Sequence, residues 1–215
     1  MAPSAAPTEI LPGLFHWRAI HPGIHSEVSS YWLESGVAID PLLSDAITVE
    51  WFAGRSNPAR AVLLSNRHHY RSSGAFRARF GCEVWCNATG LHEFTEGQEV
   101  TGFVPGDTLP GPAIACEVDA ICPDDTGLYL PDQQALVFAD AIVLGGRGLG
   151  FVPDRLMDEP EQTKSAILAA CSRLLDDEQL DFTHLLLAHG GPVIGDGRAR
   201  LQELVADGGR TAFEM

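Results

Sequence analysis

Leu63–Gly74 has the sequence LLSNRHHYRSSG, in which the end of an apolar segment is followed at once by a polar turn. The run from Ala61 to Ser65 predicts a buried strand, because its residues are nearly all apolar. The turn after it carries two adjacent histidines, His68 and His69. Ligands of open α/β sheets bind beyond the carboxyl ends of strands, so this turn is the predicted functional site.

The segments on either side of the turn predict strands that alternate with helices. They are a strand at 36–41, a helix capped by Ser44 or Asp45 and ending at Arg55, a short helix at 74–80 and a strand at 82–86. Upstream, two aromatic-rich strands are predicted at 14–17 and 30–33. Near-continuous apolar strands separated by helices predict a sheet that helices cover.

The second half of the chain predicts another sheet. Short strands recur at 114–118, 127–130 and 135–138, which is typical of a meander, and a last strand is predicted at 184–188. Helices are predicted from Pro160 onward and at 198–205, whereas 93–112 and 145–150 are rich in Gly or Pro and predict loops. With no repeat and no linker, we expect a flexible tail over 1–9 and a single domain over 10–215.

Composition limits the classes of partner. The chain has 215 residues, 45% of them hydrophobic, and a formal net charge of -15, which argues against nucleic acid and anionic membranes. A small-molecule ligand fits better, and the oligomeric state is left open. The five cysteines form no CxxC pair, and Met1–Glu9 has neither a basic nor an apolar stretch, so we expect a cytoplasmic protein without a signal peptide.

The stretch that contains the two histidines resembles the metal-binding loop of the metallo-β-lactamase fold superfamily, His-x-His-x-Asp-His-x-x-Gly at the end of a buried strand. Aligned on Gly74, the four ligand positions of that pattern fall on Asn66, His68, Tyr70 and Arg71. The resemblance implies an α+β fold, the four-layer αβ/βα sandwich. It also implies a pocket lined by Asn66, Tyr70 and Arg71.

Three further positions match ligands of the superfamily. Asp140 in Phe138–Ala141 matches its metal-bridging aspartate, Asp125 falls on a histidine position in the turn Pro123–Gly127, and His189 precedes Gly190 as the last histidine does. The resemblance therefore implies one mixed metal set, made of His68, Asp125, Asp140 and His189. Such a set suits Zn, Mn or Fe.

Arg71 argues against the two-metal centre of the superfamily. A guanidinium is always charged and is never a metal ligand, so Arg71 is predicted to replace a metal and to form a bidentate pair with Asp140. His69 occupies a variable position of the pattern and is predicted to pack or to face solvent. We therefore expect a pocket without a cofactor, and one Zn, Mn or Fe ion is the alternative.

Two functions follow from these alternatives. The favoured hypothesis is a degenerate metallo-β-lactamase-fold protein that has lost the dinuclear hydrolytic centre and binds a small molecule or serves as a scaffold. The other hypothesis is a mononuclear metal-dependent hydrolase of a small ester, lactone or thioester, with Asp125 or Asp140 as the base and Arg71 as the group that stabilises an oxyanion. Metal-free acid/base catalysis by His68 and Asp140 remains a third possibility.

Overall fold

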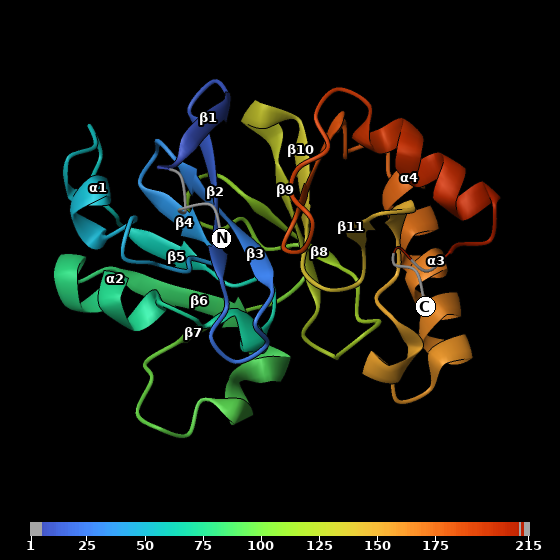
Figure 1. The fold of residues 1–215 in the computed structure, drawn as a ribbon, viewed down its shortest axis with the longest axis horizontal. Coiled ribbons are helices and arrows are strands. Elements are labelled where there is room, and N and C mark those ends of the chain that lie inside the picture. Colours follow the sequence, from blue (N-terminus) through green and yellow to red (C-terminus); the bar gives the residue numbers. More distant parts are fainter. Residues whose placement is uncertain (1–5, 211, 213–215) are drawn as a thin grey trace.

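The computed structural model describes residues 6–210 and 212, and its main feature is two β-sheets packed face to face with helices on both outer sides (Figure 1). The larger sheet contains, in spatial order, β1 (Thr8–Leu11), β2 (Leu14–Ile20), β3 (Glu27–Leu33), β4 (Val37–Ile39), β5 (Ala61–Leu63), β6 (Glu83–Asn87) and β7 (Thr101–Phe103). The smaller sheet has the order β13 (His184–Leu187), β10 (Ala135–Phe138), β9 (Thr126–Leu130) and β8 (Ile114–Glu117). This is the predicted four-layer αβ/βα sandwich.

The connections between strands determine which loops can meet. β4, β5, β6 and β7 run parallel, and α1 (Val49–Ala53) and α2 (Ser73–Phe80) connect β4 to β5 and β5 to β6. In the smaller sheet β10 and β13 are parallel, with α3 (Pro160–Asp176) between them in the chain. Carboxyl ends of neighbouring parallel strands share one edge of a sheet, so each sheet brings two loops together there.

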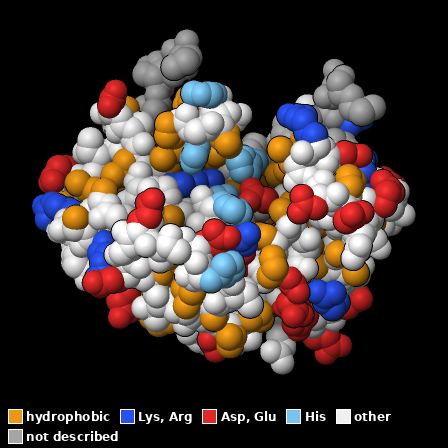
Figure 2. Space-filling view, turned by 90° about the horizontal axis from the view of Figure 1, so that it is seen from below, with side chains coloured by type: hydrophobic (Ala, Val, Ile, Leu, Met, Phe, Trp, Pro, Cys, Tyr) orange, Lys and Arg blue, Asp and Glu red, His pale blue; other side chains and the backbone are white. Residues whose placement is uncertain are grey.

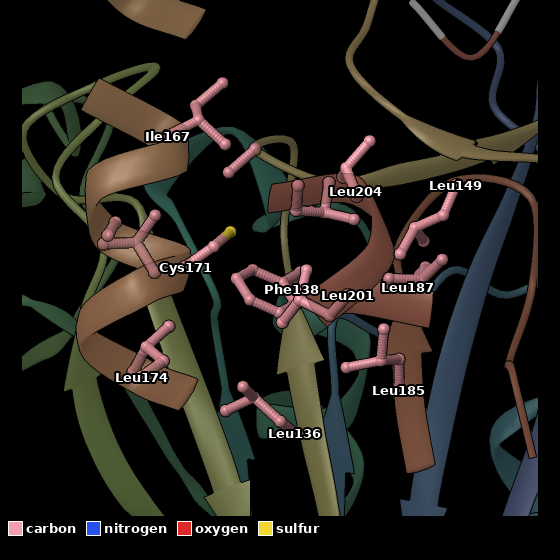
Figure 3. Close-up of a cluster of buried hydrophobic side chains, with 14 of the residues drawn as sticks. Leu136, Phe138, Leu149, Ile167, Cys171, Leu174, Leu185, Leu187, Leu201 and Leu204 are labelled. Carbon is pink, nitrogen blue, oxygen red and sulfur yellow. The ribbon is translucent and has the colours of Figure 1, made fainter. Parts of the chain in front are cut away.

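Three apolar layers hold the four structural layers together. Leu33, Leu63 and Leu128 belong to the layer between the two sheets, and the outer face of the larger sheet packs on α1 and α2 through Trp32 and Phe52. Figure 3 shows the third layer, where α3 and α4 (Gly197–Ala206) cover the smaller sheet. Its members include Leu136, Phe138, Ile167, Cys171, Leu185, Leu187, Leu201 and Leu204. Burial of apolar faces on both sides explains why these strands lack polar alternation.

Several boundaries differ from the sequence predictions. The tail predicted over 1–9 is wrong for its last two residues, because Thr8 and Glu9 pair with β2; residues 1–5 lie outside the described residues. The predicted helix from Ser44 begins only at Val49, since Ser44 and Ile47 form a bridge. β7 occupies part of the predicted loop 93–112, and β11 (Val143–Gly145) pairs with β12 (Gly148–Gly150) in another predicted loop.

Four single-turn or two-turn 3-10 helices complete the described chain: η1 (Arg67–His69), η2 (Ala88–Glu93), η3 (Pro131–Gln133) and η4 (Asp154–Leu156). Trp17, Tyr31 and Trp32 are buried, as expected for core residues, and all five cysteines are free thiols. Among the described helices, none combines the length and the apolar character needed to cross a lipid bilayer.

Candidate functional site

The candidate site lies where the strand ends of the two sheets meet. Asp40 follows β4 and η1 follows β5 in the larger sheet, while Asp140 and His189 follow β10 and β13 in the smaller one. Two backbone hydrogen bonds join the sheets here, from Ser29 N to Ala188 O (2.8 Å) and from Thr126 N to Ser65 O (2.9 Å). Figure 2 shows several histidines gathered on this face, along the hollow between the halves of the molecule.

His69 is the buried imidazole of the turn, with 4% of its surface exposed. The turn is a 3-10 helix because the side chain of Asn66 caps it and accepts a hydrogen bond from His68 N (3.0 Å). His69 Nδ1 lies 3.0 Å from both Asp40 Oδ2 and Ser65 Oγ. Asp40 is in turn fixed by Ser65, whose backbone N–H (2.9 Å) and hydroxyl donate to its carboxylate. These contacts leave His69 Nε2 free to face Asp140.

Asp140 is the centre of the group. Its Oδ1 lies 3.0 Å from His189 Nε2 and 3.5 Å from His69 Nε2, and its Oδ2 accepts from Asn66 Nδ2 (2.7 Å). One ligand atom each of His69, Asp140 and His189 lies within 4.8 Å of the others. His189 and Asp140 are each 21% exposed at the side chain, so the group opens to solvent on one side.

The charges of this group stabilise one another. Burial and the charge of Arg71 lower the pKa of His69, but the carboxylates of Asp40 and Asp140 outweigh them and raise it from 6.5 to about 9. Burial alone would raise the pKa of Asp140, yet the charge of His69 and hydrogen bonds from both histidines hold it well below its ordinary value. At neutral pH the group therefore contains an imidazolium between two carboxylates.

Asp125 is buried beside this group. It is 2% exposed, and no side chain among the described residues donates a hydrogen bond to its carboxyl oxygens. Burial and the nearby charge of Asp140 raise its pKa well above the ordinary value. A hydrogen bond from the backbone of Asp140 lowers this pKa but does not offset the burial.

Arg71 contacts the backbone of Asp40. Its Nη1 donates to Ser29 O (3.0 Å) and Asp40 O (2.9 Å), and its backbone φ of 40° falls in the left-handed region. The predicted bidentate pair between Arg71 and Asp140 is wrong. The carboxylate of Asp140 is occupied by Asn66, His69 and His189, so the guanidinium binds backbone carbonyls instead.

The same arrangement of layers and strand ends occurs in known structures. A metallo-beta-lactamase family protein from Thermus thermophilus superposes with a TM-score of 0.69 at 20% identity, covering 93% of this chain and 80% of that one. The metallo beta lactamase from Erythrobacter litoralis gives a TM-score of 0.67 at 13% identity, covering 96% and 98%. This chain has the metallo-β-lactamase fold. Comparison with protein-family models and with curated protein sequences finds no match.

A third structure bears on the metal question. TTHA1623 in a di-iron-bound form superposes with a TM-score of 0.62 at 17% identity, covering 82% of this chain and 93% of that one. The metallo-β-lactamase fold places Asp140 and His189 of this chain together, as the resemblance implies. It places His69, rather than His68, beside them. At these identities the likeness concerns the fold alone.

The other residues predicted for the site lie around this group. His68 is exposed at the surface of η1, and Asn66 contacts Asp140 directly. Tyr70 is half-buried and packs against Phe94, with 5.7 Å between the ring centroids. One signal in the sequence points to His69. Asp40 follows the strand next to β5, so it can offer a buried carboxylate to one of the two adjacent histidines, and that histidine is then the buried one.

The residues present fit a single metal ion. Two imidazole nitrogens and one carboxylate are a common donor set for catalytic zinc and for iron, and leave coordination positions open. Asp40 contacts the second nitrogen of His69, which is how carboxylates orient metal-ligating histidines. Within the described chain, His69, Asp140 and His189 form the group of ligand atoms with metal-site spacing, and Arg71 adds a cation close by.

Proposed function

We propose that the protein is a mononuclear metal-dependent hydrolase of a small ester, lactone or thioester, and that it has lost a dinuclear centre. The observation that supports this most is the convergence of His69, Asp140 and His189, whose ligand atoms lie within 4.8 Å of one another. A metal ion bound there supplies a Lewis acid and an activated water. The supporting likeness is to proteins of the same fold, among them a metallo-β-lactamase and a member of the metallo-β-lactamase family.

The residues around the group have separate roles in this proposal. Asp40 holds the Nδ1 proton of His69 and so keeps Nε2 available as a ligand. Asp125 is the buried carboxyl group placed to accept or return a proton, since burial and the charge of Asp140 raise its pKa and no side chain among the described residues donates to it. Arg71 contributes a fixed positive charge next to the group.

One observation favours a second function, a metal-free pocket that binds a small molecule. In the protein as described, His69 and Arg71 provide two cations that balance the charges of Asp40 and Asp140. A metal ion must displace the proton of His69, whose pKa of about 9 makes that proton a strong competitor at neutral pH. The cytoplasmic location and the absence of a nucleic-acid partner stay predictions from composition.

The metal content of the purified protein separates the two functions. The chain is produced without a metal-binding tag or chelator, and Zn, Mn and Fe are measured by inductively coupled plasma mass spectrometry. The proposal predicts about one metal ion per chain, retained in His68→Ala and lost in His189→Ala and Asp140→Asn. His68→Ala is the matched control, because it removes the neighbouring exposed imidazole from the same turn.

Activity then tests the hydrolase itself. The metal-loaded chain is assayed against p-nitrophenyl acetate, a thioester and a lactone, with and without chelator. Turnover that chelator abolishes and zinc or iron restores supports the proposal. Substoichiometric metal that is equal in the wild type and in His189→Ala would favour the metal-free binding pocket instead.

A further inference from the structure

The guanidinium of Arg71 is bound along only one part of its hydrogen-bonding surface. Nη1 donates twice, to Ser29 O and to Asp40 O. Nε is buried and has no partner, and no described residue accepts a hydrogen bond from Nη2. Two backbone carbonyls thus fix the position of the group, while two of its nitrogen donors are unused.

The two unused donors lie on the same edge of the planar guanidinium. This Nε–Nη2 edge is the fork that binds both oxygens of a carboxylate or phosphate. A buried N–H without an acceptor destabilises a folded protein and is rare. The left-handed φ of 40° at Arg71 is a second strained feature, and such strain is found where a side chain must take one orientation for function.

We propose that the site binds an oxyanionic group of its ligand, a carboxylate or a phosphate, through Nε and Nη2 of Arg71. For the choice of substrate the inference rests on the proposed hydrolase, and it selects esters, lactones or thioesters that carry such a group. The binding of the anion itself needs no metal, so the two proposals can fail separately.

The test observes the Arg71 Nε–H signal directly. Metal-free protein labelled with nitrogen-15 arginine is titrated with acetate and, separately, with inorganic phosphate at constant ionic strength, and the arginine Nε–H resonances are recorded by NMR. Arg71→Lys assigns the resonance, because it keeps the charge but removes the fork. We expect a saturable shift of the Arg71 signal, while the signal of Arg155, an exposed residue of η4, follows only the bulk salt effect.

Variants give the size of the effect. Loss of two charge-assisted hydrogen bonds in Arg71→Lys should weaken binding of the responding anion roughly tenfold or more. Arg155→Lys is the matched control and should change nothing. If Arg71→Lys does not fold, the saturable shift in the wild-type protein still decides.

The outcomes separate clearly. A saturable response of Arg71 to acetate or to phosphate supports the inference and identifies the group, even if no metal binds and the hydrolase proposal fails. An Arg71 signal that neither anion shifts, or unchanged affinity in Arg71→Lys, overturns the inference. In that case a metal-loaded and active protein would still support the hydrolase.

Discussion

The two sheets contribute to the site in different ways. The smaller sheet places Asp140 and His189 directly after the ends of parallel strands, where the superfamily pattern puts them. The larger sheet contributes a turn in which the pattern positions hold Asn66, His68, Tyr70 and Arg71, and its imidazole comes from His69 instead. The residues just after the strands of the smaller sheet thus occupy the ligand positions of the pattern. In the turn of the larger sheet, the capping residue and the hydrogen-bond partners determine which histidine enters the site.

A substitution at Gly190 tests how the smaller sheet positions His189, and we expect it to have the largest effect on stability. The φ of Gly190 is 93°, and a Cβ there would lie 1.9 Å from the backbone oxygen of Leu144. Gly190→Ala should destabilise the protein by about 4 kcal/mol in urea unfolding and displace His189, because neither backbone can yield freely. Gly191→Ala is the control, since it has φ 94° but nothing within 4 Å of the added Cβ. Equal losses in both variants would show that strain in φ, and not the contact, dominates.

Asp124 tests what holds the turn of the larger sheet. Its buried carboxylate accepts from Arg67 N (2.6 Å) and forms an ion pair with the Arg67 guanidinium, which ties η1 to the loop before β9. Asp124→Ala should destabilise the protein by about 3 kcal/mol, because it leaves a largely buried cation with only the exposed carboxylate of Glu93 as a partner. Glu93→Gln removes the exposed partner of the same arginine and should cost less than about 0.5 kcal/mol. Chemical denaturation compares them, and similar losses would contradict the assigned role of Asp124.

His69 gives a smaller effect that depends on pH. Its pKa is about 9 in the folded protein against 6.5 ordinarily, so the stabilisation is complete below about pH 6.5 and is lost as the pH rises through 9. The free energy of unfolding of chelator-treated protein should fall by roughly 2–3 kcal/mol over this range. Urea unfolding at several pH values measures it. A fall of the same size in His69→Gln would assign the titration to other groups.

The layers of the fold were predictable from the chain because the central strands β4, β5, β9 and β10 are apolar and buried on both faces. The sequence places β4, β5 and β10 correctly, and the packing of the two sheets against each other brings Asp140, after β10, toward the turn after β5. What the sequence could not specify is the local geometry of that turn. It depends on Asn66, which caps the turn and also donates to Asp140, a residue 74 positions away.

For the same reason, the local sequence could not show which of the two adjacent histidines enters the site. His68 matches the pattern, yet His69 is buried because Asp40 and Ser65 supply partners for its Nδ1. The predicted role of Asp125 as a ligand or base stays a prediction, although its carboxyl group lies next to Asp140. Pairings made only in the folded chain decide which side chain a turn presents.

The two hydrogen bonds from Ser29 to Ala188 and from Thr126 to Ser65 lie at the seam between the halves of the molecule. An ion held by His69, Asp140 and His189 would be bonded to both halves and would act as a cross-link across that seam. Loading the site should therefore make the two sheets unfold together more cooperatively, since the ion is lost as soon as either half opens. The metal ion would then stabilise the packing of the two sheets in addition to its role in the reaction.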